Sequence, residues 1–388
     1  RLGVGNIAGV GTAIAGGRPG AASWMCLMAF VGGASSFIES SLAQLFKVRD
    51  KDGFRGGPAY YMERGLKARW LGIWFAVILI ICFPFAFSSL QANTIAATVV
   101  ATIGDGSPGW LPWVIGAAVA VLTALVVFGG VRRIASVTQL LVPVMALAYL
   151  LLGLIVVAVN LERVPEVFAQ IFTQAFGFNE VVGAAFGYIV LTGVKRGMFS
   201  NEAGLGSAPN AGASAAVTHP VKQGLVQTLG VYFDTFLVCS ITAFIILVSV
   251  PDLAGAQRGI DLTQGALVST LGAWSSVALS VIIFLLAFSS ILGNYYYGES
   301  NIEFINPAPW LLTGYRTLVV VAVLVGSVVG ADLVWNFADG VMGLMALTNL
   351  IAIGLLSGVA FRLLKDYTQQ RREGRDPVFT RDRLPEVT

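Results

Sequence analysis

The sequence predicts an all-α polytopic membrane protein. Hydrophobic residues make up 56% of its 388 residues and charged residues only 12%, and the mean hydropathy is +0.79. A soluble domain would carry about twice this fraction of charged residues. The apolar residues fall into runs long enough to cross a bilayer, which takes about 20 helical residues, and two runs are interrupted by glycines and polar groups. This composition excludes a soluble globular domain.

Ten apolar runs are expected to form the membrane helices. In chain order they are residues 1–18, 22–46, 70–101, 110–129, 135–159, 181–209, 220–250, 264–297, 312–330 and 334–364. Eighteen lysine and arginine residues fall in the loops and tail on one side of this topology, and three fall on the other. Because basic loops stay in the cytoplasm, we predict a multi-pass protein of the cell membrane with a cytoplasmic C-terminus.

Two glycine-rich interruptions carry the functional prediction. Residues 3–11 and 192–206 each place glycines and polar groups between apolar flanks. Glycine lowers helix propensity, and non-helical backbone survives at membrane depth only where protein buries it or where it lines a wet cavity. Glycine-lined helix contacts are the alternative, because small residues also let membrane helices approach closely. Two interruptions in corresponding halves favour an inverted-repeat transporter, with its site where the breaks meet.

Four motifs resemble the alanine or glycine:cation symporter family. They are GVGNIAGV at residues 3–10, RGGPAYY at 55–61, KRGMFSNEAGLGSAP at 195–209 and YYYGE at 295–299. The third is long and specific, and the resemblance extends to the end of the last apolar run. It implies a LeuT-type fold of five plus five inverted helices with discontinuous first and sixth helices. We expect the half of the first helix that precedes its break to lie outside this chain.

The resemblance also implies a function and a domain organisation. The protein would be a secondary symporter that imports alanine or glycine with sodium by alternating access, with no organic cofactor and no catalytic residues. Its partners would be the amino acid and the lipid bilayer, without nucleic acid. The expected divisions are a first repeat at 1–160, an amphipathic connector at 161–180, a second repeat at 181–364 and a disordered or surface-lying cytoplasmic tail at 365–388.

A zwitterionic substrate needs donors for its carboxylate and acceptors for its ammonium group. Broken helices supply both through freed N–H and C=O groups. The resemblance assigns the carboxylate to the backbone of Gly3, Val4 and Gly5. It assigns the ammonium group to the backbone near Thr192, Gly193 and Gly197. Small residues around both breaks favour a compact cavity, which suits a small side chain.

Two amides are expected to contribute to this site. Asn6 matches a site position in related transporters and also suits a cap for the restarted helix, and we expect it to fill both roles. Gln91 lies in the third helix, where its amide can donate to a carboxylate and accept from an ammonium group. An interhelical hydrogen bond is the alternative for Gln91, whereas Asn93 is assigned to packing.

The coupling sodium ion requires hard oxygen ligands. Ser289 and Ser290 match the hydroxyl pair on the eighth helix of LeuT-type sodium sites, and the carbonyls of Leu2 and Leu286 would complete much of the shell. The alternative is that both serines bond back to the preceding helical turn. Asn294 stands where the resemblance leads us to expect an aromatic residue.

Buried carboxylates leave other functions open. Such groups are costly at membrane depth and are functional by default, although pairing with Lys195, Arg196 or freed N–H groups would make some structural. The carboxylates concerned are Glu39, Glu202, Asp234 and Asp339. For Glu39 and Asp234 an architectural role is favoured. A proton-coupled transporter with Glu202 or Asp234 as carrier is the near alternative, and a membrane-embedded aspartyl protease using Asp234 is the distant one.

The only histidine, His219, precedes Pro220 at an expected helix start, so we assign it to the helix end. The three cysteines all lie in apolar runs without paired spacing. Neither residue type therefore indicates a metal site or a disulfide framework.

Overall fold

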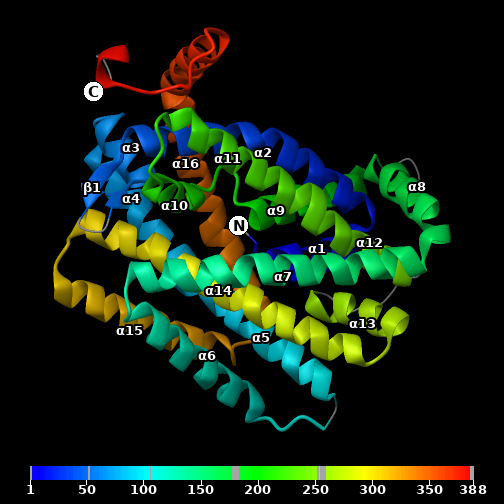
Figure 1. The fold of residues 1–388 in the computed structure, drawn as a ribbon. Helices are drawn as coiled ribbons and strands as arrows, with labels where there is room; N and C mark the ends of the chain where they lie inside the picture. The colour runs from blue at the N-terminus through cyan, green and yellow to red at the C-terminus, as the bar shows by residue number, and fades with distance from the viewer. Residues whose placement is uncertain are drawn as a thin grey trace.

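The computed structural model describes residues 2–50, 53–104, 106–176, 183–250, 253 and 259–384, and the chain is predominantly helical (Figure 1). Among these residues, seven helical stretches are long and apolar enough to cross a membrane. They are α2 (Gly20–Leu45), Arg69–Ile103, Arg133–Val159 within α7 (Val131–Val159), Pro220–Ser249, α14 (Trp274–Ile305), α15 (Pro309–Gly326) and α16 (Ala331–Arg372).

The other three predicted segments are also helical in their described parts. Two are short, namely η1 (Val4–Asn6) with α1 (Ala8–Gly17), and α6 (Leu111–Val127). The third consists of α9 (Gly183–Asn201) and α10 (Ala208–Ser214), which a non-helical loop separates. All ten predicted segments are thus helical in the part of the chain that the structure describes, and seven of them are long and apolar enough to cross a membrane.

Two of the long helices contain a π-helical turn, which inserts one extra residue and is frequent at functional sites. The first helix consists of α4 (Arg69–Ile80), η2 (Ile81–Phe87) and α5 (Ser88–Ile103). Pro84 lies inside η2, where it lacks the N–H that a regular helix uses. The second helix consists of α11 (Pro220–Tyr232), η4 (Phe233–Cys239) and α12 (Ser240–Ser249).

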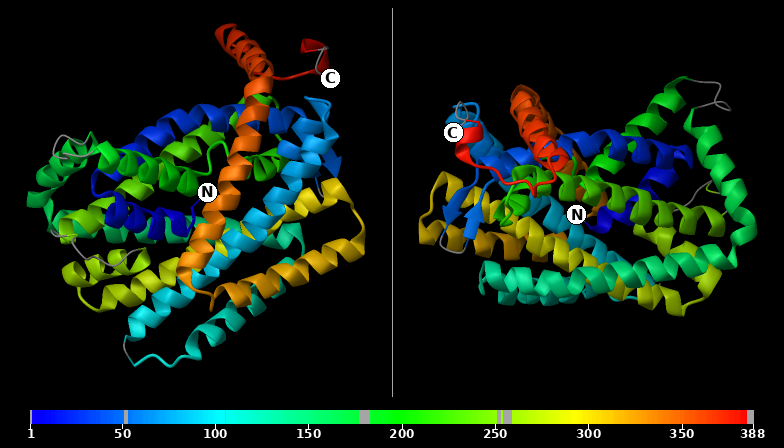
Figure 2. Two further views of the ribbon diagram at one scale, coloured as in Figure 1. Left: turned by 180° about the vertical axis from the view of Figure 1, so that it is seen from behind. Right: turned by 45° about the horizontal axis from the view of Figure 1, so that its top comes forward.

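Helix α14 packs against α4, α5, α7 and α15, whereas α2 packs against α9 and α11. In Figure 1, α2, α9 and α11 lie together above α7 and α14. Figure 2 shows α16 running across the back of the bundle and projecting beyond it. Glycine permits the closest of these contacts: a Cβ on Gly224 of α11 would collide with Ser41 and Phe37 of α2.

The connecting segments lie at two opposite ends of the bundle (Figure 1). One end carries the antiparallel hairpin of β1 (Val48–Asp50) and β2 (Gly53–Arg55), together with α3 (Pro58–Arg64) and α10. There, Arg55 pairs with Glu303 of α14, and Lys47 Nζ donates to the Ala215 carbonyl at 2.8 Å. Several basic loops thus share one end, as the predicted topology requires, while the cytoplasmic location of that end stays a prediction.

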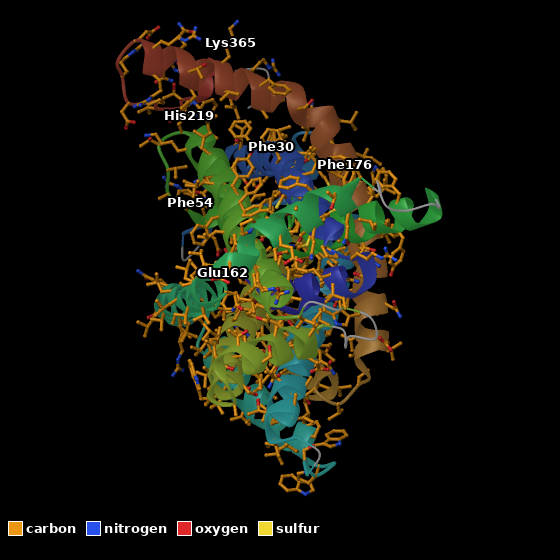
Figure 3. The ribbon with its side chains drawn as sticks, turned by 90° about the vertical axis from the view of Figure 1, so that its right-hand side faces the viewer. Phe30, Phe54, Glu162, Phe176, His219 and Lys365 are labelled. Carbon is orange, nitrogen blue, oxygen red and sulfur yellow. The ribbon has the colours of Figure 1, made fainter. Side chains whose placement is uncertain are left out.

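The opposite end carries α8 (Val164–Ala175) and α13 (Ile260–Leu271). Helix α8 is amphipathic: it buries Val167 and Ile171, whereas Glu166 and Thr173 are exposed. Trp24 Nε1 donates to the Ala175 carbonyl at 2.7 Å and fastens α8 to α2. Figure 3 faces this end and labels Glu162, just before α8, and Phe176, just after it. Residues 177–180 of the predicted connector lie outside the described residues.

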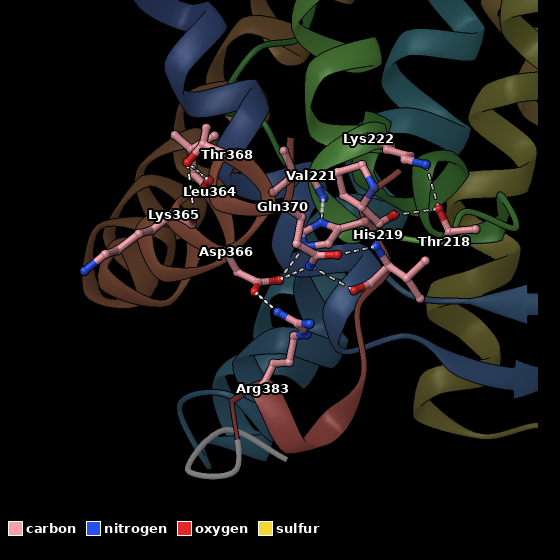
Figure 4. A network of polar contacts seen from close by, with 12 residues as sticks. Thr218, His219, Val221, Lys222, Leu364, Lys365, Asp366, Thr368, Gln370 and Arg383 are labelled. Atoms are coloured by element: carbon pink, nitrogen blue, oxygen red, sulfur yellow. Dashed lines mark hydrogen bonds and ion pairs between the residues drawn. The ribbon is translucent and has the colours of Figure 1, made fainter. Parts of the chain in front are cut away.

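The C-terminal tail was expected to be disordered or to lie on the surface, and over residues 373–384 the structure shows the second alternative. Helix α16 continues to Arg372, and the segment after it folds back against the start of α11 (Figure 4). Phe379 N donates to the Thr218 carbonyl at 2.9 Å, and Gln370 and Val378 exchange two hydrogen bonds of 3.0 Å. This docking is hard to predict from the sequence, because a few irregularly spaced contacts are sufficient for it.

His219 caps the start of α11, which confirms its predicted helix-end position. Its side chain also contacts Asp366 of α16 and Phe379 of the docked tail. Its Nδ1 accepts from Val221 N at 3.2 Å, and its Nε2 lies 3.1 Å from Asp366 Oδ2. Arg383 Nη1 donates to the other oxygen of Asp366 at 2.6 Å (Figure 4). Burial lowers the pKa of His219, and the neighbouring Asp366 opposes this shift without reversing it.

We expect acidification to release the tail. Because the pKa of docked His219 lies below the value of about 6.5 for free histidine, the undocked state binds more protons, and docking is lost as the pH falls below about 6.5. Hydrogen–deuterium exchange of residues 373–384, corrected for the intrinsic pH dependence of exchange, should therefore increase. His219→Asn, which keeps a capping acceptor, should remove this response. A flat profile in the unmodified protein would contradict the assignment.

Candidate functional site

The first break frees two backbone donors, and side chains capture both. Gly3 is extended, with φ −150° and ψ −178°, and the chain becomes helical only at η1. Gly3 N donates to Asn6 Oδ1 at 2.9 Å, and Val4 N donates to Gln91 Oε1 at 3.3 Å. Asn6 therefore fills its predicted capping role. Gln91 makes the interhelical hydrogen bond that was its alternative.

The second break spans residues 202–207, in the C-terminal part of the predicted stretch. Glu202, Gly204 and Gly206 have φ values of 55°, 80° and 81°, a left-handed backbone that glycine adopts without a Cβ clash. The fully buried Glu39 accepts from Gly204 N at 3.3 Å and from Gly206 N at 3.1 Å. Glu39 thus has the architectural role that was favoured for it.

The prediction of free backbone at Thr192, Gly193 and Gly197 is wrong, because all three lie inside the continuous helix α9. A Cβ on Gly193 would collide with Ala21 and Trp24, and one on Gly197 would lie 3.1 Å from the backbone of Met25. These two glycines therefore serve the close contact with α2. A glycine-lined helix contact was the alternative interpretation of this glycine-rich stretch.

The two breaks adjoin each other beside a cavity of about 830 Å³. A Cβ on Gly5 would lie 2.8 Å from the Phe199 ring and 3.2 Å from Ser200 Cα, so the first break packs on the last turn of α9. The predicted residues that line the cavity are Leu2, Gly3, Gly5, Gln91, Ser289 and Ser290. The cavity is larger than the compact one expected, because its lining extends along α7 and α11.

Three further predicted residues lie behind this lining. Val4 and Asn6 are 0% exposed, and Leu286 is 2% exposed. Asn6 thus braces the break, and the structure does not place its side chain in the cavity wall. Asn93 donates to the carbonyls of Gly326 and Val329 at 3.2 and 2.7 Å, which agrees with the packing role expected for it.

The residues predicted to hold sodium come together. Ser290 Oγ donates to the Leu2 carbonyl at 3.0 Å and to the Leu286 carbonyl at 2.9 Å. Ser289 Oγ also reaches the Leu286 carbonyl at 2.9 Å. Both serines donate to a carbonyl in the preceding helical turn, as the alternative hypothesis for them predicts. The contact of Ser290 with Leu2, however, is long-range and joins the first break to α14. Carbonyl and hydroxyl oxygens fit a hard monovalent cation, so this donor set suits sodium.

Asp234, on η4, connects the two breaks. Its Oδ1 accepts from Asn6 Nδ2 at 2.6 Å, and its Oδ2 accepts from Ser200 Oγ at 2.9 Å. Sequence reasoning missed Ser200, although a hydroxyl directly before the motif's Asn201 and Glu202 was an available signal. An amide and a hydroxyl are thus two of the partners of Asp234.

Two aromatic rings, Phe87 and Phe199, line one side of the cavity, and an ion pair packs against the aromatic cluster that they belong to. Phe199 stacks on Phe87 with 4.5 Å between ring centroids and lies 5.0 Å from Trp335. One turn earlier, Arg196 Nη2 pairs with Asp339 Oδ2 at 2.7 Å, and its guanidinium carbon lies 4.5 Å from the centroid of the Trp335 ring. Lys195 Nζ also lies 2.6 Å from that oxygen, so the expected pairing of a membrane carboxylate with Lys195 and Arg196 is confirmed.

We expect Gly5→Ala to destabilise the protein by about 1–3 kcal/mol, because the new methyl group would overlap the Phe199 ring. Gly9→Ala is the matched control: its methyl group would meet no atom within 4 Å, and alanine improves helix propensity by about 1 kcal/mol. Thermal unfolding of the purified protein in detergent measures both. Equal midpoints for the two variants would contradict the packing of the first break on α9.

Comparison with known proteins agrees with this geometry. The sodium:alanine symporter family profile matches residues 1–381. Amino-acid carrier protein AlsT of Bacillus subtilis is 52% identical, covering 99% of this chain and 81% of that protein. The probable sodium/glutamine symporter GlnT of the same organism is 47% identical, with coverages of 99% and 79%. The sodium/proton-dependent alanine carrier protein of Bacillus sp. PS3 is 35% identical, with coverages of 98% and 88%. The chain belongs to the sodium:alanine symporter family.

Proposed function

We propose that the protein imports alanine or glycine together with sodium by alternating access. Membership of the family makes it a sodium-coupled amino-acid symporter. The observation that carries the proposal is the position of the Leu2–Gly3 peptide group. Its carbonyl contacts Ser290 in the oxygen set that suits sodium, and both residues line the cavity. One unwound segment would thus serve the cation and the substrate.

For the fold we propose the LeuT-type arrangement, with repeats at residues 1–160 and 181–364, a connector at 161–180 and a cytoplasmic tail at 365–388. Its support is the non-helical backbone at Gly3 in the first break, which packs beside the last turn of α9 through Gly5, and the non-helical loop that separates α9 from α10. We place the protein in the cell membrane, where helices of this length and hydropathy span the hydrocarbon core.

For the substrate carboxylate we propose the backbone at Gly3, Val4 and Gly5 together with Gln91. The N–H groups of Gly3 and Val4 already donate to amide oxygens. A carboxylate is a stronger acceptor than an amide oxygen, so it can replace Gln91 Oε1 at Val4 N while the Gln91 amide group turns to donate. The ammonium group is then left to the carbonyl and hydroxyl groups around Ser200 and the second break.

For the cation we propose the carbonyls of Leu2 and Leu286 with the hydroxyls of Ser289 and Ser290. A bound sodium ion would supply the positive charge that holds the first break against α14. The two serine hydroxyls must turn their hydrogens away to act as ligands, which single-bond rotation permits.

Proton coupling is the second candidate, and one observation favours it. The Glu202 carboxyl group lines the cavity directly at the second break, where Ser207 donates to it. Uptake measured in sodium, lithium and potassium at fixed pH separates the two couplings. Full uptake without sodium would overturn sodium coupling, and an unchanged sodium requirement in Glu202→Gln would remove the proton candidate.

We expect Ser290→Ala and Gln91→Ala to separate the two binding sites. Ser290→Ala should raise the sodium concentration for half-maximal alanine binding by roughly tenfold, because one oxygen ligand is lost, with a smaller effect on alanine affinity at saturating sodium. Gln91→Ala should lower alanine affinity by a similar factor at saturating sodium.

The matched control is Ser357→Ala, which removes a half-buried serine that bonds back to Gly354 on α16, outside the residues that line the cavity. It should bind both ligands as the unmodified protein does. Competition by glycine and glutamine in the same assay defines the substrate class. If Ser290→Ala left the sodium requirement unchanged, the assignment of the cation site would be wrong.

A further inference from the structure

We propose that Asp234 is a positioning residue for the cation site and that it acts through Asn6 on the Leu2–Gly3 peptide group. The proposal rests on the proposed function, because it takes the oxygen set around Ser290 as the sodium site. It gives the buried carboxyl group a role that is neither proton transfer nor substrate contact.

The Leu2 carbonyl and the Gly3 N–H belong to one planar peptide group, so they point in opposite directions and turn together. Gly3 N donates to Asn6 Oδ1 at 2.9 Å on one side, and Leu2 O accepts from Ser290 Oγ at 3.0 Å on the other. A glycine junction adopts many orientations unless it is held. The Asn6 side chain therefore sets the direction in which the Leu2 carbonyl faces the cation site.

Asp234 determines which way the Asn6 amide faces. Asn6 Nδ2 donates to Asp234 Oδ1 at 2.6 Å, and a carboxylate can only accept hydrogen bonds. The amide nitrogen must face Asp234, which leaves Asn6 Oδ1 for the Gly3 N–H. Asn6 is 0% exposed and Asp234 is 1% exposed, although Asp234 also lines the cavity, so the Asn6 amide is held by protein groups.

Two further contacts hold this relay in place. Ser200 Oγ donates to Asp234 Oδ2 at 2.9 Å and fixes the carboxyl group from the end of α9. Thr242 Oγ1 donates to the Asn6 carbonyl at 2.8 Å. This second bond anchors the backbone of Asn6 without touching its amide, so it offers a control for the general anchoring of this residue.

The test measures sodium binding by the full chain carrying Asp234→Asn. An amide at this position can donate as well as accept, so it no longer fixes the orientation of Asn6. The sodium concentration that gives half-maximal thermal stabilisation in detergent should rise roughly fivefold to tenfold, the difference between a charge-assisted and a neutral hydrogen bond. Alanine affinity at saturating sodium should change by less than about twofold.

Exchanging the two residues provides the second variant. Asn6→Asp alone places two carboxyl groups in contact, where they repel each other, and it should abolish the stabilisation by sodium. Asn6→Asp combined with Asp234→Asn restores one carboxylate and one amide: the carboxylate accepts from Gly3 N, and the amide donates to it and still accepts from Ser200. We expect the sodium half-saturation to return to within about twofold of the unmodified protein.

The control is Thr242→Val, which should lower thermal stability and leave sodium half-saturation within about twofold. An unchanged sodium half-saturation in Asp234→Asn would overturn the relay. The same conclusion follows if the exchanged pair fails to fold, or folds without recovering sodium binding, because the role of Asp234 is then structural. Failure of the proposed function gives a different result: the unmodified protein would be stabilised equally by sodium and by potassium.

Discussion

Non-helical backbone at membrane depth must find its hydrogen-bond partners inside the protein, and the arrangement around the cavity follows from that requirement. Asn6 and Gln91 accept from the first break, and Glu39 accepts from two amides of the second. Each of these residues is polar, buried and placed in an otherwise apolar run. Their hydrogen bonds offset the cost of leaving helical geometry, so a cavity lined partly by backbone can exist in this bundle.

Each break is hydrogen-bonded to a carboxyl group from the other half of the chain. Glu39 on α2 holds the break at Gly204 and Gly206, far along the sequence, while Asp234 on η4 holds Asn6 at the chain's beginning. Gln91 and Asn349 add contacts to the break in their own half. In the alternating-access mechanism that we propose, movement of one half against the other would act on both unwound segments, which would couple the release of the two solutes.

The sequence predicted the helices and the non-helical backbone at Gly3, but it also predicted free backbone at Thr192, Gly193 and Gly197, where α9 is continuous. Helices follow from runs of apolar residues, whereas contacts such as Ser290 with Leu2, 288 positions apart, were reached only through the resemblance. The sequence does not distinguish Gly193 from Gly204, because both are glycines in the same glycine-rich stretch. They differ in the structure because Gly193 packs inside a helix and Gly204 adopts a positive φ, and tertiary packing decides between these two uses of glycine.

The single extra residue in each π-helical turn determines which way the following helix faces. One residue of α-helix corresponds to a rotation of about 100°, so a deletion within Ile81–Phe87 would turn Gln91 away from Val4 without altering the hydropathy of the segment. The same holds for Thr242 after Phe233–Cys239. The protein should therefore tolerate insertions and deletions least in Ile81–Phe87 and Phe233–Cys239, although both stretches have the apolar composition of an ordinary membrane helix. The number of residues there is constrained as strictly as their identity.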